Sequence, residues 1–437
     1  MALSGIGEQE VIHKIWWKIL PFIFVLFIIN ILDRVNIGYA ALLMNADLGI
    51  DPWVFGLISG IFFIGYFLFE IPSNHILARV GARIWLARIM ITWGIIVVVM
   101  AFVRTPSELG ILRFFLGVAE AGFFPGIILY LSFWFRERDV AKSYAFFIAA
   151  MPVALVIGSP LSTWIIQSVD WYGLAGWRWV FILEGIPAVI AGICTVLFLP
   201  SMPRDAKWLD TAEKQWLEQE LKAEQVKGTL PRHIPFCELA RKPIVLVLTL
   251  CLFMLYFALF GIVFWLPQIV KSFAITTSVF SIGILLMIPY AAATIGMLVW
   301  GWHSDRTGER VFHVILPLLI AAAAFVADAL VYNSTFSLIC LGVALVALFS
   351  ATPPFWAIAV TGISPGLRPA GTAFINAFAS LGSFSGPVIL GLFVQHTQEY
   401  DAVSGLFVLS GVLVLCCIIL ASSGKRDSAG VALRRDS

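Results

Sequence analysis

The sequence predicts an all-α membrane protein in which twelve transmembrane helices form two pseudo-symmetric six-helix bundles. Of the 437 residues, 60% are hydrophobic and only 12% are charged. The mean hydropathy of +0.96 lies far above the range of soluble domains of this length. Apolar runs long enough to cross a bilayer recur along the whole chain, and landmarks of the first half return in the second half at a constant spacing.

Each predicted span is an apolar run of about 18 or more residues, the length that a helix needs to cross the hydrocarbon core. The first run follows a mixed polar segment without a cleavage signal, so we expect the amino terminus to be retained. In chain order, the predicted spans are 17–42, 53–77, 85–103, 107–134, 143–168, 178–199, 243–268, 280–301, 312–331, 336–358, 370–394 and 404–421.

Lysine and arginine predict the orientation of these spans, because they concentrate in cytoplasmic segments. With both termini in the cytoplasm, the outside loops contain only Arg104, Arg178 and Lys271. The inside segments contain eight basic residues between 204 and 242, together with Lys14, Lys18, Arg79, Arg83, Arg136, Arg138, Lys142, Arg306, Arg310, Arg368, Lys425 and Arg426. The net charge of +2 gives no indication of nucleic-acid binding.

One long polar stretch separates the two sets of six spans. The predicted units are a six-helix bundle at 1–200, a cytoplasmic linker at 201–242, and a second six-helix bundle with a cytoplasmic tail at 243–437. Within the linker, Asp210 and Glu213 have the spacing of a capping box, which starts a helix. Trp216, Leu217 and Leu221 then give this helix an apolar face, so we expect it to lie along the cytoplasmic surface.

The two halves share matching residues at an offset of 227 positions. The motif Arg79-x-Gly81-x-Arg83 returns as Arg306-x-Gly308-x-Arg310, and Pro160 corresponds to Pro387. This repeat indicates duplication of a six-span unit. Under the same offset, the charged residues of the first and fourth spans fall on Phe260, Gly261, Cys340 and Ala347. The intramembrane charge therefore belongs to the first half alone.

Those charged residues are Asp33 and Arg34 in the first span and Arg113 and Glu120 in the fourth. At 1.5 Å per residue, Asp33 lies about 24 Å from the inner end of its span, and Arg113 lies about 9 Å from the outer end of its own. In a core of about 30 Å the two reach similar depths, and Glu120 follows two turns after Arg113 on the same side. We therefore expect all four side chains to face one cavity.

Such a cluster has two interpretations. Buried ion pairs could simply tie the two helices together, although they stabilise proteins poorly compared with apolar packing. Alternatively, the guanidiniums attract an organic anion while the carboxylates bind and release protons. Burial favours the neutral form of a carboxylate and a neighbouring guanidinium favours the charged form. A substrate that takes over the guanidinium would therefore promote protonation, which couples anion and proton movement.

Several stretches closely resemble the anion:cation symporter branch of the major facilitator superfamily, and within it the bacterial tartrate-transporter-like and phthalate-permease-like members. They are LDRVNIGYAALLM, FFIGYFLFEIPSNHILARVGAR, RFFLGVAEAGFFPGIILY, GLAGWRWVFILEGIPA, FWLPQIVKSF, GWHSDRTGERVFHV and PPFWAI. The resemblance implies two six-helix bundles, alternating access, and proton-coupled uptake of a small carboxylate across the bacterial inner membrane. It implies proton-binding roles for Asp33 and Glu120.

The resemblance also implies substrate-binding roles for Arg34, Arg113, Tyr66 and Asn376. The superfamily motif G-x-x-x-D-R-x-G-R suggests gating roles for Arg79 and Arg83 after the second span, and for Asp305, Arg306 and Arg310 after the eighth. The first copy departs from the motif, since Asn74 and Ala78 stand where Gly and Asp are usual. Near Asn376, Ser380 and Ser383 replace residues usual in the relatives, which leaves the identity of the substrate open.

The expected function is import of a small organic carboxylate together with protons, with a tartrate-like hydroxy dicarboxylate as the preferred substrate. Aromatic acids such as phthalate or hydroxyphenylacetate, and drug efflux in exchange for protons, are the alternatives. We expect no enzyme activity, no metal site, no cofactor other than the coupling proton, and a monomer. Glu70 and Glu184 are interpreted as packing or capping groups near span ends.

Overall fold

The computed structural model describes residues 7–227, 236–273, 275–276, 278–331, 333–363, 367–396 and 403–435. The helices of the first half are α1 (Glu8–Leu48), α2 (Pro52–Val80), α3 (Ala82–Met100), α4 (Pro106–Glu120), α5 (Phe123–Ser132), α6 (Glu137–Ser168) and α7 (Gly176–Phe198). Those of the second half are α10 (Pro243–Ser272), α11 (Val279–Thr307), α12 (Val311–Leu330), α13 (Ser334–Gly362), α14 (Arg368–His396) and α15 (Val403–Arg435). Between them lie α8 (Thr211–Lys227) and α9 (Phe236–Leu239), and short 3₁₀ turns occur at Trp171–Gly173 and Pro203–Asp205.

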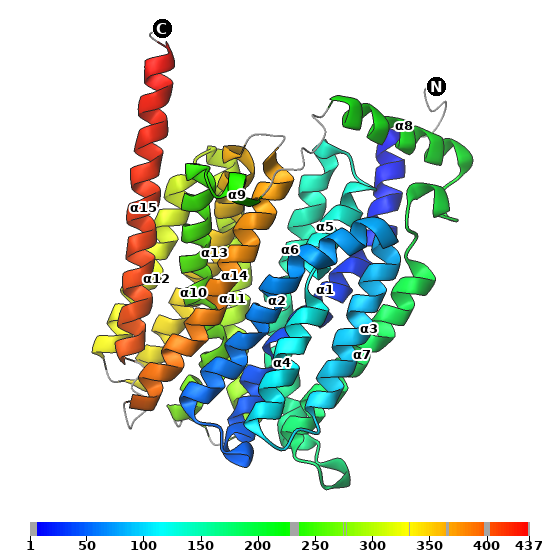
Figure 1. Cartoon of the computed structure of the whole chain (residues 1–437). Helices are drawn as coiled ribbons and strands as arrows, with labels where there is room; N and C mark the ends of the chain where they lie inside the picture. The colour runs from blue at the N-terminus through cyan, green and yellow to red at the C-terminus, as the bar shows by residue number, and fades with distance from the viewer. Residues whose placement is uncertain are drawn as a thin grey trace.

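The two halves stand side by side as bundles of long, roughly parallel helices (Figure 1). Helix α8 lies across one end of the first bundle, and we call this end of the molecule the linker face. The opposite end, which carries the α1–α2 and α6–α7 connections, is called the far face. Helices α2 and α14 run next to each other where the bundles meet.

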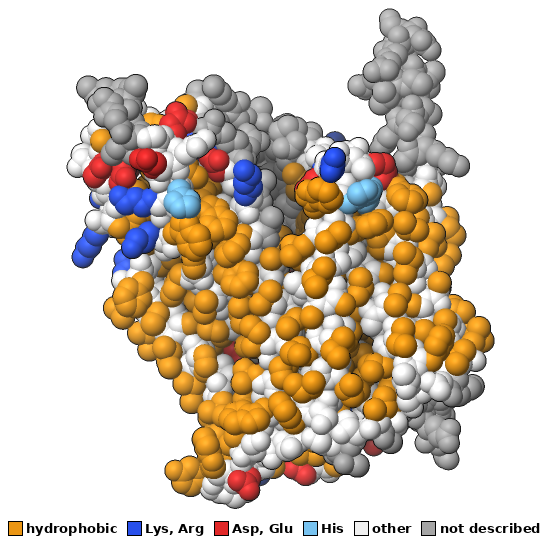
Figure 2. Space-filling model, turned by 180° about the vertical axis from the view of Figure 1, so that it is seen from behind, with side chains coloured by type: hydrophobic (Ala, Val, Ile, Leu, Met, Phe, Trp, Pro, Cys, Tyr) orange, Lys and Arg blue, Asp and Glu red, His pale blue; other side chains and the backbone are white. Residues whose placement is uncertain are grey.

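Eleven helices of the described chain are long and apolar enough to cross a membrane, and Phe407–Ser422 of α15 forms a shorter apolar segment. Hydrophobic side chains cover the middle of the surface, whereas charged side chains gather at the two ends (Figure 2). A belt of this kind suits the hydrocarbon core of a bilayer. The arrangement agrees with the predicted all-α membrane fold.

The predicted span at 107–134 is not one continuous helix. It breaks between α4 and α5, where Ala121 has a non-helical ψ of 130° and Gly122 has a φ of 90°. Pro125 has no N–H to donate to the carbonyl of Ala121, and its ring crowds that carbonyl, so the helix is interrupted one turn earlier. A side chain at Gly122 would also place its Cβ 2.2 Å from Ser73 Oγ. The break leaves Glu120 at the carboxyl end of α4.

Close helix packing joins the two halves toward the far face. A Cβ on Gly56 or Gly60 of α2 would lie 2.4 or 2.6 Å from a carbonyl oxygen of α14, so glycine permits the contact. Asn45 of α1 donates to Gln268 of α10 at 3.0 Å, and Lys271 donates to the carbonyl of Leu42 at 2.5 Å. These contacts hold the two halves together toward the far face.

Helix α8 begins at the capping box that the sequence predicts. The backbone N–H of Glu213 donates to Asp210 at 2.7 Å, and the backbone N–H of Asp210 donates to the Glu213 carboxylate at 2.8 Å. Glu213 also pairs with Lys14 of α1 at 2.9 Å. Trp216 and Leu217 are buried, so the apolar face of this helix packs on the protein itself.

Candidate functional site

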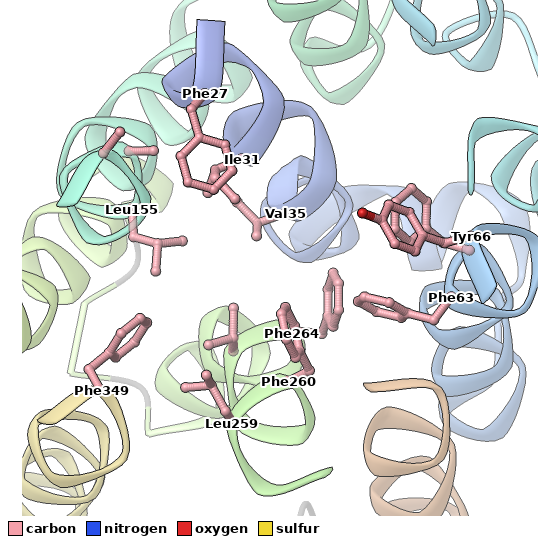
Figure 3. Close-up of a cluster of buried hydrophobic side chains, with 14 of the residues drawn as sticks. Phe27, Ile31, Val35, Phe63, Tyr66, Leu155, Leu259, Phe260, Phe264 and Phe349 are labelled. Atoms are coloured by element: carbon pink, nitrogen blue, oxygen red, sulfur yellow. The ribbon is translucent and has the colours of Figure 1, made fainter. Parts of the chain in front are cut away.

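A cavity of about 90 Å³ lies between the two halves. Figure 3 shows its apolar surroundings, with Ile31 and Val35 of α1 facing Leu259 and Phe260 of α10. Both halves contribute to the wall, which consists of Phe27, Ile31, Arg34, Phe63, Tyr66, Phe124, Ile148, Met151, Pro152, Tyr256, Leu259, Phe260, Met297, Phe349, Thr352, Asn376, Ser380 and Ser383. Among these lining residues, Arg34 carries the only full charge at neutral pH.

Arg34 forms an ion pair with Glu120 of α4. Its Nε donates to Glu120 Oε1 at 2.9 Å, and its guanidinium lies 5.3 Å from the ring centre of Phe62 and 5.4 Å from that of Tyr66. The side chain of Arg34 is 14% exposed, whereas that of Glu120 is fully buried. Arg34 therefore separates Glu120 from the cavity.

Arg113 of α4 lies close to the ring of Phe62, as Arg34 does. Its guanidinium is 5.0 Å from the ring centre of Phe62, it is fully buried, and one of its nitrogens donates to the carbonyl of Ser59 at 3.4 Å. Its Nε and Nη1 have no hydrogen-bond partner in the described chain, and neither does Glu120 Oε2. Two guanidiniums thus flank one phenyl ring with one ion-paired carboxylate, a combination that attracts an anion.

Asp33 does not face this cavity. Its Oδ2 accepts a hydrogen bond from Trp93 of α3 at 2.9 Å, and the side chain is fully buried. Glu184 of α7, which accepts from Ser162 of α6 at 2.6 Å, repels it electrostatically, and so does Glu120 of α4. Consecutive residues of an α-helix point about 100° apart, because one turn takes 3.6 residues. Asp33 and Arg34 therefore face different neighbours. The expectation of one shared cavity for all four charges is wrong, because only Arg34 lines it, whereas the other three side chains are fully buried outside its lining.

The two remaining candidate ligands do meet at the cavity. Tyr66 is on α2, and Asn376 reaches the wall from α14. Asn376 Nδ2 donates to Glu70 Oε1 at 3.0 Å. Glu70 is 2% exposed and joins the two halves, so of the packing and capping interpretations only the capping one is wrong. The sequence contains one indication that Glu70 belongs to the site: it follows Tyr66 by four residues, which places both side chains on the same face of α2.

The sequence comparison decides the family. The profile of the Major Facilitator Superfamily matches residues 23–359 and 273–430, which together cover most of the chain. The chain belongs to the major facilitator superfamily. This finding confirms the resemblance inferred from the motifs and the predicted fold class. The members of this superfamily are transporters, so the chain is a multi-pass membrane transporter and not an enzyme.

Two curated relatives and one solved structure show the range of similar proteins. The "Putative tartrate transporter" of Agrobacterium vitis is 44% identical over 430 residues, which cover 98% of this chain and 94% of that protein. The "Quinolone resistance transporter" of Acinetobacter baumannii is 35% identical over 432 residues, which cover 98% and 99%. A bacterial homologue of the human lysosomal transporter Spinster, crystallised in an inward-facing and occupied conformation, has a TM-score of 0.76 at 15% identity, covering 93% of this chain and 96% of that one. That last likeness concerns the fold alone.

The superfamily motif lies at the linker face in both halves. In the second copy, Arg310 pairs with Asp305 at 2.6 Å, and the Arg306 guanidinium lies 5.5 Å from the Trp302 ring. In the first copy, Arg83 Nε donates to the carbonyl of Val196 at 2.8 Å, and Arg79 is exposed. Of the two copies, the second, which keeps Gly301 and Asp305 of the motif, thus forms the carboxylate–arginine contact. The gating roles of these residues stay predictions.

A carboxylate next to the second motif is held in its charged form. Burial alone would raise the pKa of Glu309, but hydrogen bonds from the Phe312 backbone and from His313 bring it below the usual value. Glu309 lies between α11 and α12 and is exposed, so it supports the turn rather than the cavity. Among the described residues, no group of three or more His, Cys, Asp or Glu side chains is placed to hold a metal ion.

Proposed function

We propose that this protein is a proton-coupled importer of a small organic carboxylate, with a tartrate-like hydroxy dicarboxylate as the best candidate, working by alternating access. We further propose that it acts as a monomer in the bacterial inner membrane with both termini in the cytoplasm, as the distribution of basic residues indicates. The name of the Agrobacterium vitis relative supports the same substrate class.

One observation carries the proposal: Arg34, which is ion-paired with the buried Glu120, lines the cavity, and Arg113 nearby has two guanidinium nitrogens without a hydrogen-bond partner in the described chain. A carboxylate that enters the cavity meets Arg34 first. Asn376 and the hydroxyl of Tyr66 offer further hydrogen bonds from opposite halves. A ligand held by both halves at once suits transport by movement of one half against the other.

The same ion pair supplies a mechanism for proton coupling. When substrate takes Arg34, Glu120 remains fully buried with less compensation for its charge. Burial then favours protonation of Glu120. Asp33 is a second candidate proton site, since its Oδ1 is buried without a hydrogen-bond partner in the described chain. Importing a dicarboxylate against about 100 mV costs about 4.6 kcal/mol, and two accompanying protons offset that cost.

Cavity size favours a small substrate. Pockets for drug-sized ligands typically measure about 300–1,000 Å³, whereas this cavity measures about 90 Å³. The aromatic side chains in its wall keep an aromatic carboxylate as the second candidate. The quinolone resistance relative makes efflux in exchange for protons the third, although a drug would need a wider cavity than the described conformation provides.

Uptake into proteoliposomes tests the proposal. With acid outside and neutral pH inside, we expect accumulation of labelled tartrate, stopped by a protonophore and stimulated by a negative interior if more protons than negative charges enter. The same assay with labelled phthalate compares uptake of an aromatic carboxylate with uptake of tartrate. Expulsion of substrate toward an acidic side, with no acid-driven uptake of either acid, would replace the importer by an antiporter.

A further inference from the structure

Glu70 is a buried carboxylate that the mechanism above does not use. It lies on α2, one turn beyond Tyr66, and only 2% of it is exposed. Its Oε1 accepts the 3.0 Å hydrogen bond from Asn376 of α14, and its Oε2 has no hydrogen-bond partner in the described chain. The contact therefore joins the first half to the second beside the cavity.

Several charged or titratable groups on the surrounding helices interact with this carboxylate. Arg34 of α1 interacts with it electrostatically, as do Tyr66 of α2 and Tyr256 of α10. Asn376 is its contact on α14. Arg34 and Asn376 are two of the groups proposed above to bind the substrate. The groups around Glu70 thus include the ones that are proposed to bind the carboxylate of the substrate.

The negative charge of Glu70 is not needed merely to fasten α2 to α14. A glutamine would accept the same hydrogen bond from Asn376 through its side-chain carbonyl and would avoid a charge in the membrane, which costs at least about 2.5 kcal/mol at the centre of a span. With the two guanidiniums near Phe62 opposed by Glu120 alone, a second carboxylate balances the site when no substrate is present.

We propose that Glu70 is an internal competitor of the substrate and a further proton-binding residue of the transport cycle. In the empty carrier it accepts from Asn376 and offsets the charge of Arg34. A substrate carboxylate takes both partners, and Glu70, then buried without them, binds a proton from the water of the cavity. Its release from Asn376 also loosens α2 from α14, so occupancy of the site alters the contact between the halves. This inference rests on the proposed binding of a carboxylate.

The substitution Glu70→Gln distinguishes competition with the substrate from a purely structural contact between α2 and α14. It keeps the hydrogen-bond acceptor and the side-chain volume but removes the charge. Tartrate affinity is measured by calorimetry on the purified full chain between pH 5 and 8. We expect binding at pH 8 to tighten about tenfold, as expected for loss of competition for one charged hydrogen bond. We also expect the slope of log Kd against pH to fall by up to about one proton per substrate.

Controls make each outcome decisive. Glu70→Met, which removes both acceptor oxygens, should give the same two changes and replaces the glutamine variant if that one does not fold. Asp328→Asn alters a buried carboxylate of α12 that does not line the cavity, and should change neither quantity. Unchanged or weaker tartrate binding in folded Glu70 variants, with an unchanged pH slope, would overturn the inference. If the unaltered protein binds neither tartrate nor phthalate at any pH, the proposed function itself fails.

Discussion

Replacing Arg34 by methionine should destabilise the protein more than replacing Glu120, its partner. Glu120 is fully buried and receives hydrogen bonds from Arg34, so Arg34→Met leaves a buried carboxylate without them. Removing one member of a buried pair typically costs about 3–5 kcal/mol. We expect a value at the lower end of that range, because Arg113 stays close enough to Glu120 to offset part of its charge. Glu120→Met should cost less, since Arg34 reaches the cavity and its water.

The double variant Arg34→Met with Glu120→Met completes the test. Apolar side chains of similar volume can replace a buried ion pair with little loss of stability, so the double variant should recover at least half of the loss seen in Arg34→Met. Unfolding in mixed micelles with increasing denaturing detergent gives the three free-energy differences of the cycle. If Arg34→Met is as stable as the unaltered protein, or if the two single losses simply add, the pair does not compensate buried charge and the coupling mechanism loses its basis.

Three other changes probe separate parts of the molecule. Glu120→Gln keeps an acceptor for Arg34 but cannot release a proton, so it should abolish acid-driven accumulation while retaining exchange of labelled for unlabelled tartrate; full accumulation would exclude Glu120 as a proton site. Gly122→Ala should lower the unfolding free energy by more than about 1 kcal/mol, because φ is 90° and the added Cβ would lie 2.2 Å from Ser73 Oγ. Gly110→Ala, whose Cβ meets only Ile58 at 3.7 Å, is the matched control, and equal losses would contradict this account of the break. Asp210→Ala removes the side chain that caps α8 and should cost about 1 kcal/mol in a thermal unfolding assay without changing tartrate affinity; altered affinity would show that α8 acts on the site.

Features set by neighbouring residues could be predicted from the sequence. The capping box of α8 depends on two residues three positions apart, and the spans depend on the polarity of contiguous runs. The break after Glu120 was missed although its cause is also local. A hydropathy scan averages over Pro125 and Gly122, so it records one apolar run where the backbone has two helices.

Features set by side-chain direction and by distant partners could not be predicted in the same way. Depth along a helix placed Asp33 and Arg34 together, but their rotation about the helix axis sends one to Trp93 and the other to Glu120. The role of Glu70 depends on Asn376, a residue 306 positions away on another bundle. A carboxylate near the end of an apolar run looks like a cap until the opposite helix is known.

The internal repeat and its exceptions together explain the shape of the site. Related bundles would give the cavity two equivalent walls, yet the position equivalent to Arg34 is Gly261, which carries no side chain, and Phe260 next to it lines the cavity opposite α1. The wall from the first half therefore holds the guanidinium, while the wall from the second half offers Asn376, hydroxyl groups and aromatic rings. In the proposed mechanism, a charged wall facing a neutral one would hold a carboxylate to the first half by charge and to the second by hydrogen bonds only. Under this proposal, contacts with the second half would change during movement while the anion stays beside its countercharge. Separating the two charges would be far costlier in a medium of low dielectric constant.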